Sequence, residues 1–139
     1  MKTPHQTIAA LLAITIWADG EYSETERFMA DEIANTFRIP AADLGRYIAD
    51  AFAEIDGLDE AAAHVYLRRH ASRVHPLEIP DIFRAAIHMV LADGELTSGE
   101  VNNLLAISEA LGIDYSTATL MLCDMVKADP EIELTYERV

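Results

Sequence analysis

The sequence predicts an all-α domain of about seven helices, and three observations lead to this prediction. Apolar residues recur at helical spacing along most of the 139-residue chain. No stretch alternates apolar and polar residues as a half-buried strand does. One short unit, Ala-Asp-Gly-Glu followed by a capped helical stretch, occurs at residues 18–21 and again at 92–95. The length suits one domain with one core.

Three helices are expected in the first half of the chain. The first starts at a cap offered by Thr3 and ends near Asp19. The second begins at Ser23 and ends before Pro40, which interrupts the pattern. A third covers roughly residues 41–53. The apolar positions of the second helix are Phe28, Met29, Ile33 and Phe37.

The second half opens with an alanine-rich connecting helix over residues 59–74. A fifth helix follows Pro80 and ends at Asp93. The sixth begins at Thr97, and Gly112 closes it as a C-cap. These boundaries follow from residues that favour helix ends.

A seventh helix begins at Asp114 or Ser116 and runs to about Ala128. Cys123 lies in its apolar run and is expected to be a buried thiol. Residues 129–139 form an acidic C-terminal tail.

The repeat predicts an internal pseudo-symmetric duplication. Residues 16–39 align without gaps onto residues 90–113, and the identities concentrate in the acidic turn. We therefore expect one helical domain over residues 1–128 that contains two related units, at about 8–53 and 82–128.

The charge of the chain limits the classes of partner. Ten Lys and Arg stand against 24 Asp and Glu, which gives a formal net charge of −14. Such a surface repels phosphate backbones, so nucleic-acid binding is not expected. It suits cationic partners, metal ions or solubility alone. The acidic residues are spread along the chain, as on a solvated surface.

Cysteine content and the first apolar stretch bear on location. A single cysteine allows no intrachain disulfide, which fits a reducing cytoplasm. The apolar stretch at residues 8–14 is too short to span a membrane and is followed by no convincing cleavage pattern. We expect a buried helix of a soluble protein without a transmembrane segment.

Each acidic turn resembles the second half of a calcium-binding loop. With Asp19 at the fifth loop position, Gly20 takes the sharp-turn sixth position and Glu26 the bidentate twelfth. The first and third positions would be Thr15 and Trp17, and the second copy is equally poor in ligands there. Neither turn is therefore a standard calcium loop.

The turns still offer carboxylates to a divalent cation. Calcium takes about six to eight oxygen ligands, and one turn supplies fewer. If the turns face each other, they could share an ion; otherwise each could hold a weakly bound, largely hydrated ion. The candidate metal ligands are Asp19, Glu21, Glu26, Asp93, Glu95 and Glu100.

A purely structural interpretation explains much of the same pattern. Ser23 with Glu26 and Thr97 with Glu100 each match a capping box. The glycines permit a positive φ, and an aspartate accepts hydrogen bonds from turn amides. The clustering of three carboxylates in each turn is left without an explanation. Both interpretations remain open at this stage.

Two Ala-Asp-Gly-Glu turns, each followed by a Ser/Thr-x-x-Glu start and an apolar helix, resemble the TerB family. The resemblance covers about residues 8–127. It implies an all-helical, internally duplicated fold whose acidic turns bind a divalent cation such as calcium, magnesium, manganese or zinc. It also implies a role in tellurite resistance and stress response through a protein partner, in a cytoplasmic or inner-membrane-associated complex.

The second copy departs from the first in two places. Gly99 stands where a bulkier residue is expected, and Ser98 replaces the acid Glu24. The second site would therefore be less acidic than the first.

Other constellations add no catalytic centre, and we expect no enzyme activity. No Gly-rich phosphate loop, Ser-His-Asp arrangement or zinc motif occurs. The spacing of His64, His70 and His75 does not place them on one helical face, so surface or capping roles are expected. His88 is expected beside a carboxylate. The leading hypothesis is a TerB-like interaction module with cation-binding turns; the alternative is a metal-free acidic adaptor that docks a basic partner.

Overall fold

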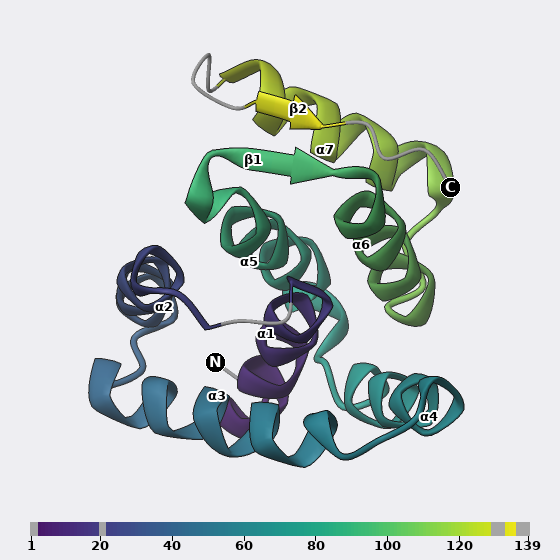
Figure 1. The fold of residues 1–139 in the computed structure, drawn as a ribbon. Helices are drawn as coiled ribbons and strands as arrows, with labels where there is room; N and C mark the ends of the chain where they lie inside the picture. The colour runs from purple at the N-terminus through teal and green to yellow at the C-terminus, as the bar shows by residue number, and fades with distance from the viewer. Residues whose placement is uncertain (1–2, 20–21, 129–132, 136–139) are drawn as a thin grey trace.

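The computed structural model describes residues 3–19, 22–128 and 133–135. Over these residues the domain is all-α, as predicted (Figure 1). Its helices are α1 (His5–Asp19), α2 (Glu24–Phe37), α3 (Ala41–Asp56), α4 (Glu60–Ala71), α5 (Ile79–Val90), α6 (Ser98–Ala110) and α7 (Tyr115–Ala128). Short 3-10 turns, η1 (Pro76–Glu78) and η2 (Leu91–Asp93), flank α5.

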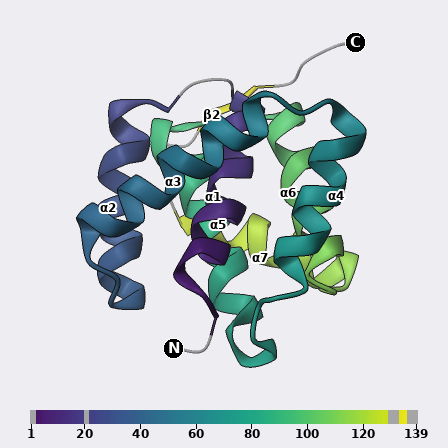
Figure 2. The same cartoon turned by 90° about the horizontal axis from the view of Figure 1, so that it is seen from below.

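Helix α1 forms the centre of the core. A helix that is apolar around its whole circumference must be enclosed on all sides. Helices α3, α4, α5 and α6 each pack against α1 and surround it (Figure 2). Its fully enclosed apolar residues are Ile8, Ala9, Ala10, Leu11, Leu12, Ala13, Ile14 and Ile16.

The buried polar groups of this region have partners within the chain. The Thr15 hydroxyl donates to the Leu12 carbonyl oxygen at 2.6 Å, which satisfies it inside its own helix. Thr3 was expected to cap α1, but its hydroxyl donates instead to Glu78 at 2.6 Å and accepts from the His75 amide at 2.9 Å. The start of the chain is therefore tied to η1 by a contact between distant residues.

Two three-residue strands were not predicted. Strand β1 (Glu95–Thr97) pairs in parallel with β2 (Glu133–Thr135). Both strands read Glu-Leu-Thr, and the pairing is in register. Three residues are too few to show the alternation that identifies a strand in a sequence.

Two apolar side chains predicted to face inward lie at the surface. Phe28 is 65% exposed, because α2 buries the face that carries Ala30 and Ile33, and Phe28 points away from it. Cys123 is exposed rather than buried. Helix α7 is an outer helix, and its fully buried residues are Ala118 and Leu122.

Helices α2 and α6 end in the same way. Arg38 and Gly112 both adopt the left-handed conformation, with φ of 58° and 79°. In each case the next residue's amide reaches back to the last turn, from Ile39 to Ala34 and from Ile113 to Ser108. The aligned units thus share their local cap geometry, whereas duplication of the fold as a whole stays a prediction.

Replacing Gly112 with alanine is expected to lower the free energy of unfolding by about 1 kcal/mol, since a side chain strains the left-handed conformation. A Cβ at this position would meet no atom within 4 Å, so the loss reports the backbone alone. Urea denaturation measures it.

The matched control is Gly57→Ala. Gly57 also has open space around its Cβ position, but its φ is −90°. This variant should be neutral or slightly stabilising. Equal losses for both variants would contradict the conformational explanation.

Candidate functional site

The second acidic turn is built by local hydrogen bonds. After η2, Gly94 takes a φ of 80°, and its amide donates to the Leu91 carbonyl oxygen at 3.0 Å. The chain then reverses into β1, and the Glu95 amide donates to Asp93 Oδ1 at 3.0 Å. Asp93 therefore acts as the turn acceptor that was predicted, while its side chain and that of Glu95 stay exposed.

Both predicted capping boxes are present. At α2, Glu26 Oε1 accepts from the amide and the hydroxyl of Ser23 at 2.8 and 2.9 Å. At α6, Glu100 Oε1 accepts from the Thr97 amide at 2.9 Å, and the Glu100 amide donates back to Thr97 Oγ1 at 3.1 Å. Glu26 and Glu100 are only 5% and 6% exposed. One oxygen of each of these carboxylates is committed to the fold.

Much of the first turn cannot be compared with the second. Gly20 and Glu21 lie outside the described residues, and the side chain of Asp19 is not described. The described candidate ligands are therefore Glu26, Asp93, Glu95 and Glu100.

The two turns belong to neighbouring parts of the fold. The 3-10 turn η2, which carries Asp93, packs against α2, the helix that follows the first turn (Figure 1). Among the described side chains, however, no three His, Cys, Asp or Glu residues gather as a metal-binding group. The described donors alone do not match the ligand number that calcium requires, and cation binding stays a prediction.

The histidines occupy separate environments. His75 caps η1, because its Nδ1 accepts from the Leu77 amide at 3.2 Å, and His64 is exposed. His88 is an exposed residue of α5 whose ring is only partly removed from water. This partial desolvation and the charge of Arg84 lower its pKa, and the charge of Glu32 opposes them. The capping role predicted for this group is confirmed at His75.

A ring pair on α4 was missed by sequence reasoning. The rings of Tyr66 and His70 are in contact, with centroids 4.5 Å apart and a tilt of 53° between their planes. His70 Nδ1 is buried without a hydrogen-bond partner in the described part of the chain. Burial, followed by the charges of Arg69 and Arg73, lowers the pKa of His70. Burial and Glu54 raise the pKa of Tyr66 to about 12. The spacing of four residues was the available signal for this contact.

In the part of the chain that the structure covers, no helix has the length and apolarity needed to cross a membrane.

Comparison with known proteins gave one match. The family model described as "Tellurite resistance protein TerB" matches residues 5–122. The match extends from the start of α1 into α7 and includes both acidic turns. Neither the curated proteins nor the solved structures contained a match.

Replacing Thr97 with alanine is expected to cost about 1 kcal/mol of stability, because the Glu100 amide loses its acceptor. The loss should be the same in EDTA and in excess calcium. The control Ser98→Ala alters the next residue, which is not the cap, and should change stability little. A Thr97→Ala loss that appears only with calcium would contradict a purely structural cap.

The lowered pKa of His70 predicts a pH-dependent stability. Its folded pKa lies below the unfolded value, so the unfolded chain binds the proton more readily. This contribution is fully present above about pH 6.5 and declines as the pH falls from 6.5 toward the folded pKa. His70→Phe should flatten the dependence measured by thermal denaturation between pH 5 and pH 7. His64→Gln, at an exposed position of the same helix, is the control, and an unchanged slope in His70→Phe would refute this role.

Proposed function

The chain belongs to the tellurite-resistance TerB family, and from this premise we propose that it is an interaction module of a stress-response assembly that docks a basic partner on its acidic surface. The family match supports a tellurite-resistance-related module in general. In this proposal the acidic turns are structural elements first, and docking does not require a metal ion.

The observation that carries the proposal is the double capping box. Each turn's terminal glutamate is nearly buried and already accepts hydrogen bonds from a helix start. A carboxylate in this position stabilises the fold without an ion. The terminal glutamates are thereby accounted for by local structure, and we propose that the exposed carboxylates of the domain serve the docking of a basic partner.

The acidic surface is concentrated where α3 meets α4. Five exposed carboxylates lie within a stretch of eleven residues there, namely Asp50, Glu54, Asp56, Asp59 and Glu60. The ion pairs of the described residues lie elsewhere, between Arg46 and Asp43 and between Arg84 and Asp81. We call the group of five carboxylates from Asp50 to Glu60 the α3–α4 corner. The negative potential of such a surface would raise both the association rate and the affinity of a basic partner.

A second candidate function, cation binding at the acidic turns, is favoured by one observation. Because η2 packs against α2, the second turn contacts the helix that follows the first turn. The exposed Asp93 and Glu95 would supply ligands, together with Asp19 and Glu21 of the first turn. Such an ion would keep much of its water.

A pull-down from the native cell extract, with and without EDTA, separates the two candidates. For the metal-free module, the same partner should be retained in both conditions, and retention should fall as salt rises. The triple variant Asp50→Asn, Asp56→Asn, Glu60→Gln at the α3–α4 corner should lose most of the partner.

The control places a neutral residue on α7, which packs against α5 and α6 and lies across the domain from α3 (Figure 1), with Asp124→Asn at an exposed position. This variant should keep the partner. Loss of the partner in EDTA alone, combined with saturable calorimetric binding of calcium that Asp93→Asn abolishes, would instead establish the cation-binding candidate.

A further inference from the structure

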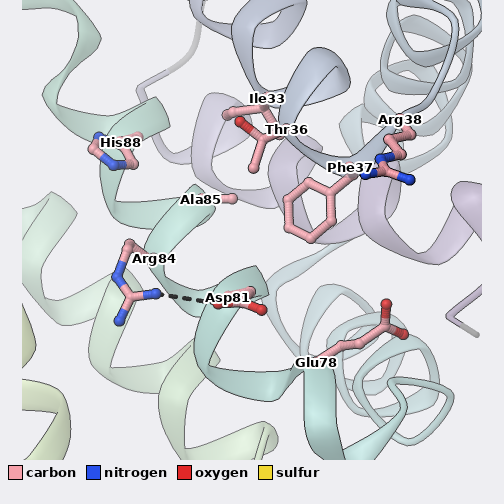
Figure 3. A pocket seen from close by; sticks show the side chains of 9 residues that line it. All are labelled: Ile33, Thr36, Phe37, Arg38, Glu78, Asp81, Arg84, Ala85 and His88. Carbon is pink, nitrogen blue, oxygen red and sulfur yellow. Dashed lines mark hydrogen bonds and ion pairs between the residues drawn. The ribbon is translucent and has the colours of Figure 1, made fainter. Parts of the chain in front are cut away.

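A cavity of about 410 Å³ lies between the C-terminal part of α2 and the face of α5 that runs from Asp81 to His88 (Figure 3). Ile33, Phe37 and Ala85 form its apolar wall. The described acidic-turn residues Glu26, Asp93, Glu95 and Glu100 are not among the residues that line it. Its volume falls in the range of small-molecule sites, which are mostly apolar with a few placed polar groups.

The two carboxylates at the rim already have donors. Glu78 accepts from the Thr3 amide and hydroxyl at 2.8 and 2.6 Å. Asp81 accepts from Arg84 at 3.2 Å. The Arg84 guanidinium offsets the charge of Asp81, whereas Glu78 keeps its negative charge and has its Oε1 occupied by the two Thr3 donors.

The basic side chains of the cavity have donors to spare. A guanidinium carries five N–H donors, and Arg84 uses one of them in its hydrogen bond to Asp81. Arg38 makes no ion pair with any described residue, and it is exposed. Figure 3 places Arg38 at one end of the cavity, Arg84 and His88 at the other, and the Phe37 ring between them. Two of the four Asp, Glu and Arg residues that line the cavity are arginines, in a chain with a net charge of −14.

The backbone supplies an independent observation. Arg38 occupies the left-handed conformation at the end of α2, where the aligned residue at the end of α6 is Gly112. This conformation strains a residue with a Cβ and costs glycine nothing. Local stability alone would favour glycine at both positions. The strain at Arg38 therefore points to a function of its side chain.

We propose that this cavity binds a small organic anion with an apolar body. The carboxylate or phosphate of the ligand pairs with the Arg38 guanidinium, which suits both groups bidentately. The apolar body lies against Phe37 and Ala85. This site is separate from the acidic turns and does not depend on the partner proposed for the acidic surface.

The test is a titration of the ¹⁵N-labelled full chain, followed by amide chemical shifts. The probes are benzoate, phenyl phosphate, inorganic phosphate and uncharged benzyl alcohol. We expect saturable shifts around residues 33–38 and 81–88 with benzoate or phenyl phosphate, with a Kd of about 1 mM or below. The stronger of these two anions identifies the preferred headgroup.

Arg38→Gly is the decisive variant, because glycine suits this backbone and the fold is preserved. Its melting temperature should equal or exceed that of the wild type, while its affinity falls at least about tenfold. Arg46→Ala is the control, since Arg46 is likewise an exposed arginine but lies on α3, outside the cavity. It should bind as the wild type does.

Three results would overturn the proposal. The first is the absence of saturable shifts with either aromatic anion. The second is equal binding of benzyl alcohol or of inorganic phosphate, which would remove the need for the charge or for the apolar body. The third is wild-type affinity in Arg38→Gly.

Discussion

The fold depends on the enclosure of α1. Five large aliphatic side chains of this helix, Ile8, Leu11, Leu12, Ile14 and Ile16, are almost wholly removed from water. At about 2 kcal/mol each, their burial is comparable with the whole net stability of a domain. No single partner helix can cover a helix that is apolar on every side. Four helices therefore pack around α1, and α2 and α7 are left as outer helices with exposed faces.

Hydrogen bonds fix several of the helix ends around this core. The Thr3–Glu78 contact ties the start of the chain to η1. Capping boxes start α2 and α6, and left-handed residues end both helices. The terminal glutamates of the acidic turns, Glu26 and Glu100, form part of these helix starts. A role in cation binding would have to use the exposed Asp93 and Glu95 and the residues of the first turn.

Charge is distributed unevenly over the resulting surface. The α3–α4 corner carries exposed carboxylates, which suit a basic partner. The cavity between α2 and α5 combines guanidinium groups with an apolar wall and suits a small anion. Membership of the TerB family is consistent with both surfaces and assigns neither. Two different ligands could therefore engage the domain at separate places.

Local interactions are what the sequence by itself determined. Helix starts at Ser23 and Thr97 and the turn acceptor Asp93 were predictable, because their hydrogen bonds join residues two or three apart. Tertiary structure alone decided the exposure of Phe28 and Cys123, the pairing of β1 with β2, and the cavity beside Arg38. The strand pairing and the cavity join segments that lie about 40 residues apart or more in the sequence. The exposure of Phe28 and Cys123 depends on which helices end up on the outside of the domain. Apolar periodicity shows that a helix has a buried face, but it does not show which neighbours cover that face or what they leave open.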